Sequence, residues 1–217
     1  MSLILRLATG LALVGLVAGC VAEEVSAPQA EIEAASYATS GPPTVRLLTM
    51  VSNRNGSGGH SALVIDGAER LVFDPAGSWH HPLVPERNDV LFGMSPQLFG
   101  FYMDYHARET YHVLVQEMPV TPEQAAALSR AVQVHGAVPQ ARCARSISTL
   151  LSGVPGFETI RPTWFPVNLS EQFSELSGVT EDRVYDDDSD DNLELLQAQA
   201  RAARTREIAA AAASDDG

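Results

Sequence analysis

Cysteine is nearly absent from this chain of 217 residues, which contains only Cys20 and Cys143. Two cysteines allow at most one disulfide, so a small fold held together by a disulfide framework is excluded. The chain must instead be stabilised by a hydrophobic core. A hydrophobic content of 45% is sufficient for one domain at this length.

Lysine is absent altogether. All 14 basic residues are arginines, they face 27 acidic residues, and the formal net charge is −13. A chain this acidic is repelled by the phosphates of nucleic acids and by anionic lipid headgroups. We therefore expect no nucleic-acid partner and no attraction to membranes through charge.

Long hydrophobic runs are also missing. The apolar stretch Leu7–Leu16 is shorter than the roughly 20 residues that a membrane-spanning helix needs. It follows Arg6 and precedes a group of small residues, the pattern of a secretory signal peptide over residues 1–19.

The residues at the end of this stretch, Leu16-Val-Ala-Gly-Cys20, resemble the bacterial lipobox. In that family the cysteine is acylated, with palmitate or a similar chain, and becomes the new N-terminus. The resemblance implies a lipoprotein of the bacterial cell envelope, attached to a membrane through Cys20 and facing the periplasm or the exterior. More than one acyl chain would anchor it stably. An ordinary secretory peptide with a chance cysteine is the alternative.

The composition along the chain predicts four segments. Residues 1–19 are the expected signal peptide, and residues 20–43, rich in Ala, Glu, Ser and Pro, are expected to form a disordered, lipid-anchored tether. Residues 44–180 form the expected folded domain, to which the candidate catalytic residues below belong. The acidic and Ala/Arg-rich tail, 181–217, is expected to be partly disordered, with a terminal helix over 193–213.

Within the domain, β-branched and apolar patterns predict strands at 44–51, 60–65, 70–73 and 111–118, and Asp66-Gly67 predicts a hairpin between the second and third. Thr121, Pro122 and Gln124 form a capping box that predicts a helix over 121–135. A second helix is expected over 142–152. The sequence gives no clear pattern over 79–110. The expected fold class is α+β, an antiparallel sheet covered by these helices.

Cys143 is the first candidate for chemistry. A cysteine at the start of a helix lies in the positive end of the helix dipole, which lowers the thiol pKa, and Arg142 and Arg145 act in the same direction. Such a thiol is a nucleophile if a base lies near it. The alternative is a small core residue on the face shared with Ile147 and Leu151.

His60 and Asp74 are the candidates for the groups that would activate the thiol. His60 opens a strand after two glycines, and Asp74 follows the partner strand of the same hairpin. Antiparallel pairing brings these strand ends together, so the carboxylate can orient the imidazole as the third member of a triad does.

A histidine after glycine at the head of an apolar strand, a polar residue on the next strand and a later cysteine at a helix start resemble the permuted NlpC/P60 (papain-like) superfamily. That group contains cell-wall peptidases and amidases, and acyltransferases of the lecithin:retinol type. The resemblance implies that Cys143 is the nucleophile, His60 the base and Asp74 the third residue. No cofactor is implied.

Two metal sites compete with this interpretation. His60, Asp74, His80, His81, Asp104 and His106 supply enough zinc ligands, although no pair has a recognised spacing. The acidic run 186–191 places Asp186, Asp188 and Asp190 like calcium ligands, but the glycine and glutamate of an EF-hand loop are missing. We expect neither metal and interpret the run as a solvated linker.

The expected function is a cysteine hydrolase that cleaves an amide bond, such as one in a peptidoglycan peptide, through a thioester. Two alternatives stay open. One is a lipid acyltransferase or thioesterase with the same triad, which an apolar cleft lined by Phe92, Phe99 and Phe101 would favour. The other is a non-catalytic envelope lipoprotein in which Cys143 is only packed.

Overall fold

The computed structural model describes residue 22 and residues 24–215. They form seven strands and six helices, which in chain order are α2 (Gln29–Ala35), β1 (Thr44–Ser52), β2 (Gly58–Asp66), β3 (Arg70–Phe73), β4 (Glu86–Arg87), β5 (Val90–Leu91), α3 (Pro96–His106), β6 (Tyr111–Pro119), α4 (Pro122–His135), α5 (Cys143–Ser152), α6 (Pro166–Ser174), β7 (Thr180–Val184) and α7 (Leu193–Asp215).

The strands form one sheet in the order β4-β5-β3-β2-β1-β6-β7, and every pairing is antiparallel. The expected α+β class with an antiparallel sheet is therefore confirmed. The four predicted strands are its centre, and the hairpin at Asp66-Gly67 joins β2 to β3.

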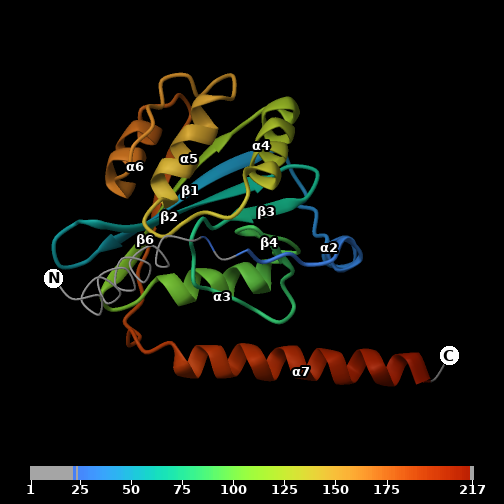
Figure 1. Ribbon diagram of the computed structural model, residues 1–217. Helices are drawn as coiled ribbons and strands as arrows, with labels where there is room; N and C mark the ends of the chain where they lie inside the picture. Colours follow the sequence, from blue (N-terminus) through green and yellow to red (C-terminus); the bar gives the residue numbers. More distant parts are fainter. Residues whose placement is uncertain (1–21, 23, 216–217) are drawn as a thin grey trace, which may run out of the picture.

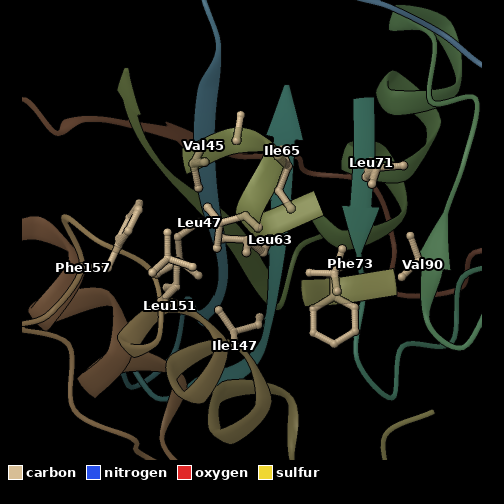
Figure 2. Packing of buried hydrophobic residues seen from close by; sticks show 14 of the residues in the cluster. Val45, Leu47, Leu63, Ile65, Leu71, Phe73, Val90, Ile147, Leu151 and Phe157 are labelled. Carbon is tan, nitrogen blue, oxygen red and sulfur yellow. The ribbon is translucent and has the colours of Figure 1, made fainter. Parts of the chain in front are cut away.

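One face of the sheet carries α4, α5 and α6 (Figure 1). Side chains alternate along a strand, so Leu47, Leu63 and Phe73 point to this face and pack against Ile147 and Leu151 of α5 (Figure 2). These five side chains are fully buried. This larger core holds α5 in a fixed place on the sheet.

The opposite face carries α3, with α7 lying beyond it (Figure 1). The alternate residues of the same strands point here, and Met50, Ala62 and Val72 pack around Trp79 and Tyr102 in a second core. The site described below lies where these two layers meet at the start of β2.

The termini of the predicted helices lie where the sequence places them. Thr121 caps α4 through the N–H of Gln124, and the Gln124 side chain accepts the N–H of Thr121, which completes the capping box. Helix α5 begins at Cys143 and ends at Ser152. The thiol is therefore in the first turn of its helix, as expected.

The region 79–110, which has no clear sequence pattern, contains β4, β5 and α3. Ser95 caps α3 through the N–H of Leu98, and Pro96 is its first residue. This Ser-Pro start is a helix signal that the sequence does carry.

Residues 24–43 differ from the disordered tether expected from composition. Ser26 bridges to Arg87, the N–H of Ala27 donates to the carbonyl of Glu86 (2.8 Å), and Ile32 of α2 is buried in the larger core. The reason is the sheet edge: β4 presents unpaired backbone groups, which this segment satisfies. Residues 1–21 lie outside the described residues, as does the proposed anchor Cys20.

The sheet also extends beyond residue 180, because β7 pairs with β6 along its whole length. The terminal helix expected over 193–213 is present as α7, where Gln199 and Ala203 are buried. Among the described residues, no helix combines the length and apolar character that crossing a membrane requires.

Candidate active site

His60 and Asp74 lie on the α3 face of the sheet. His60 pairs with Met50 of β1, and the register then shifts because Gly59 is an extra residue in β2. A bulge of this kind bends the strand and redirects the neighbouring side chain. Asp74 follows β3 directly. It is two residues after Val72, so its side chain points to the same face of the sheet as that of Val72.

The Asp74 carboxylate is buried and receives two hydrogen bonds on the same oxygen. Its Oδ1 lies 2.6 Å from Nε2 of His60, and the Tyr102 hydroxyl donates to it over 2.9 Å. With Nε2 engaged by a carboxylate, the imidazole ring is fixed in orientation. The predicted pairing of His60 with Asp74 is therefore present in the structure.

Cys143 approaches from the other layer. It is the first residue of α5 and 7% exposed, and its thiol lines the same cavity as the His60 ring, with which it interacts. The backbone N–H groups of Ser61 and Ala144 also interact with the sulfur. The three residues predicted from the sequence are thus brought together as a chain of contacts, Cys143–His60–Asp74.

The environment of His60 favours its charged form. Burial lowers the pKa of His60, but the charge and hydrogen bond of Asp74, together with Cys143, outweigh burial and raise it to about 10. Burial acts to raise the pKa of Asp74, and the neighbouring His60 prevails and lowers it. At neutral pH the site therefore holds an imidazolium against a carboxylate.

The environment of Cys143 favours the thiolate. Burial alone would raise the pKa of the thiol, but the hydrogen bond and charge of His60 and the N–H groups of Ser61 and Ala144 lower it. The thiolate is the form that attacks an acyl carbon. Burial by itself would shift the pKa in the opposite direction, so the lowered pKa depends on these neighbours.

His106 is a second histidine in the site. Its ring stacks on that of His60, with centroids 6.0 Å apart, and its Nδ1 donates to the Tyr102 carbonyl (2.8 Å). Burial, aided by the positive His60, lowers the pKa of His106 to about 4, although Asp74 opposes this. His106 is therefore neutral at physiological pH, beside a charged His60.

Two adjoining cavities open on the site, and both are lined by His60 and His106. The first, of about 260 Å³, reaches Cys143 between two short loops, and small residues such as Gly77 and Ala141 form its walls. The second, of about 460 Å³, continues past Tyr105 towards Asp190. The two cavities share His60, Tyr105 and His106, and the first of them is lined by Cys143.

The walls of the first cavity contain strained backbone. Ala76 (φ 58°) and Ala141 (φ 63°) adopt a left-handed conformation that residues with a side chain rarely occupy. One lies two residues after Asp74 and the other two residues before Cys143. Strain of this kind concentrates at functional sites, where the surroundings hold it in place.

Only three of the six candidate zinc ligands come together among the described residues. Ligand atoms of His60, Asp74 and His106 lie within 4.8 Å of one another. However, His60 Nε2 and Asp74 Oδ1 are 2.6 Å apart, whereas two ligands of one zinc ion lie about 3 Å apart or more, given bonds of about 2.0–2.2 Å. The geometry is that of a hydrogen-bonded pair. His80 is hydrogen-bonded to Glu86 elsewhere.

The acidic run is more ordered than a solvated linker. Asp188 pairs with Arg108 (3.2 Å), Asp190 accepts hydrogen bonds from Thr110, and Asp186 accepts the N–H of Asp188. These contacts hold the run beside the end of α3. Oxygens of Asp104, Asp186 and Asp188 also approach within 4.8 Å of one another, with Arg108 paired to two of them.

The three phenylalanines do not line an apolar cleft at the thiol. Phe92 is buried in the larger core. Phe99 lies beneath the guanidinium groups of Arg46 and Arg70, and Phe101 stacks on His81. The cleft expected for a lipid acyltransferase is therefore not formed by these residues.

Sequence reasoning missed Tyr102 as a partner of Asp74, and it considered His106 only as a zinc ligand. Both side chains come from α3, and their spacing of four residues places them on one face of a helix. Recognising the Ser95-Pro96 helix start would have revealed that face.

Comparison of the chain with protein-family models, with curated proteins and with solved structures finds no match. The function of the site must therefore be inferred from its own residues and geometry.

Proposed function

We propose that the protein is a cysteine hydrolase that cleaves an amide bond through a thioester on Cys143. One observation supports the proposal: a thiol at a helix start shares a cavity with His60, whose Nε2 lies 2.6 Å from the buried Asp74 carboxylate. Nucleophile, base and orienting group are the parts that acyl transfer requires.

In this mechanism the Cys143 thiolate attacks the carbonyl carbon of the amide. Backbone N–H groups in the first turn of α5 stabilise the developing oxyanion, since that turn has no side-chain cap. Protonated His60 then gives its proton to the departing amine as the C–N bond breaks, which leaves a thioester. Neutral His60 next takes a proton from water, which attacks the thioester and releases the acid and the Cys143 thiolate, so that the thiolate and protonated His60 are restored.

Chain order and layering support a permuted papain-like domain as part of the same proposal. The histidine lies on an early strand, its carboxylate follows the next strand, and the cysteine begins a later helix packed on the antiparallel sheet. We further propose that Cys20 carries the lipid of an envelope lipoprotein, which would place peptidoglycan peptides within reach as substrates.

Acyl transfer to the thiol can be tested with p-nitrophenyl acetate as the probe. We expect a burst of nitrophenolate of one equivalent per protein and an acetyl group on Cys143, found by mass spectrometry of the peptide. Cys143→Ala should show no burst, and His60→Ala should slow it by about 100-fold or more, the range for loss of a general base.

A matched control is Ser146→Ala, one turn further along α5. It should retain the burst, because Ser146 has no side-chain role in the proposed reaction. The proposal is wrong if the native protein gives no acyl-enzyme and Cys143 reacts with iodoacetamide only after unfolding. Purified peptidoglycan fragments then test the amide substrate, with release of a new amino group as the readout.

A further inference from the structure

Asp89 is a buried carboxylate in the turn that joins β4 to β5, and it is 8% exposed. Asn88 (φ 49°) and Asp89 (φ 65°) both adopt a left-handed backbone, as a tight two-residue hairpin turn requires. Asn and Asp tolerate this conformation better than other residues with side chains. The turn therefore explains the backbone of Asp89 but not the burial of its charge.

The contacts of Asp89 lead to both halves of the site. Its carbonyl accepts the N–H of Asp74 over 2.8 Å. Its carboxylate Oδ2 accepts the N–H of Val138 over 2.6 Å and the carboxylate also interacts with the N–H of Ala76. One residue thus binds the loop that follows β3 and the segment that leads into α5.

These two segments form the walls of the cavity at Cys143, and each holds one of the strained alanines, Ala76 and Ala141. Strained backbone persists only where neighbouring contacts hold it. A buried carboxylate is a stronger acceptor for N–H groups than a neutral oxygen. Burial, together with the charges of Glu86 and Asp74, raises the pKa of Asp89 to about 6, although the N–H groups of Val138 and Ala76 act to lower it. Burying the ionised carboxylate therefore costs free energy.

We propose that Asp89 is a positioning residue that holds the Asp74 loop and the Cys143 segment at the separation that keeps the thiol against His60. Asp89 contacts neither the thiol nor the imidazole in these interactions, so its effect on the reaction is indirect. The inference rests on the proposed function, because it concerns the alignment of the same nucleophile and base.

The test is the pH dependence of Cys143 alkylation by iodoacetamide in the full chain. Asp89→Asn keeps the shape and the turn conformation but replaces one oxygen by an NH₂ group that repels an N–H donor. We expect the midpoint of thiol ionisation to rise by about one pH unit and alkylation at pH 6 to slow by about tenfold. Asn88→Gly changes the same turn without removing the carboxylate and should leave both quantities unchanged.

A merely structural role would lower the melting temperature of Asp89→Asn and leave the thiol midpoint in place, and that result overturns the inference. A second measurement needs no variant: the amides of Ala76 and Val138 should exchange slowly with deuterium in the native protein. Exchange as fast as in an exposed loop would also overturn it. If the native thiol itself titrates like a free cysteine, the proposed function fails rather than the role of Asp89 alone.

Discussion

Two stacked histidines with opposite protonation preferences are the most informative feature at the scale of residues. Asp74 raises the pKa of His60 to about 10, whereas burial and the charge of His60 lower the pKa of His106 to about 4. Burial lowers both pKa values, but the charge and hydrogen bond of Asp74 outweigh it for His60, whereas the hydrogen bond of His106 goes to a neutral carbonyl. One histidine is thus held charged and the other neutral.

The lowered pKa of His106 predicts how the stability of the protein changes with pH. Between pH 6.5 and about 4 the unfolded chain binds a proton at His106 that the folded protein does not. The free energy of unfolding should therefore fall as the pH falls through this window, by up to about 1.4 kcal/mol per pH unit from this group. Urea denaturation across the window should show a shallower fall for His106→Gln. Parallel curves for variant and native protein would contradict the pKa of His106.

At the scale of elements, the loop after β3 shapes the site through a glycine. A Cβ atom built on Gly77 would lie 2.0 Å from Oδ2 of Asp74, whose Oδ1 is already bound to His60 and Tyr102. The carboxylate cannot move without losing those bonds. Gly77 is therefore the residue that allows Asp74 to face the imidazole.

Gly77→Ala should displace the Asp74 carboxylate and slow Cys143 alkylation at neutral pH by about tenfold or more, since a hydrogen bond to a charged group contributes about 1.5–3 kcal/mol. Gly100→Ala is the matched control, because Gly100 is exposed within α3 and an added Cβ meets nothing within 4 Å. It should stabilise the protein by about 1 kcal/mol through helix propensity. Equal alkylation rates in both variants would show that Asp74 tolerates the added methyl group.

The N-terminal segment gives another prediction at this scale. Ile32 is 5% exposed and belongs to the larger core. Ile32→Ala should therefore lower the free energy of unfolding by about 2–4 kcal/mol, measured by urea denaturation. The exposed neighbour Glu31 supplies the control, and Glu31→Ala should change stability by less than about 0.5 kcal/mol. A disordered tether would give no loss for Ile32→Ala.

How far the sequence predicts these elements depends on how local their signals are. The Asp66-Gly67 hairpin and the Thr121 capping box are set by adjacent residues, and both are present as predicted. β7 could not be predicted, since its residues are mostly exposed and it forms only by pairing with β6. Within the site, His60 and Asp74 are joined by the hairpin, whereas Tyr102 and Asp89 reach Asp74 through contacts that no local pattern encodes.

At the scale of the whole molecule, the proposed anchor Cys20 lies only a short way along the sequence from residues that are hydrogen-bonded to the sheet. Hydrogen bonds to the sheet edge begin at Val25, whose carbonyl accepts the N–H of Asn88 over 2.9 Å. Only a few residues separate this contact from Cys20 in the sequence. A lipid on Cys20 would therefore hold the domain close to the membrane surface.

Cys20→Ser tests the anchor directly. The variant should keep its first 19 residues and lack the acyl chains, so the mass of the exported protein changes. Native protein should partition into the detergent phase of a cloud-point extraction because of its acyl chains. Cys143→Ser is the matched control and should partition like the native protein. Identical acylation and processing in Cys20→Ser would remove the lipoprotein assignment.

The division of the site between two layers has a consequence for the chain before it folds. His60 and Asp74 belong to the face covered by α3, and Cys143 belongs to a helix on the opposite face. His60, which lowers the pKa of the Cys143 thiol, lies on the other face of the sheet, so the shift requires both layers to be packed on the sheet. Before the two layers pack together, Cys143 lacks the His60 ring that lowers its pKa and should behave as an ordinary thiol. If Cys143 acts as proposed, the activated nucleophile is therefore formed only when the fold is complete.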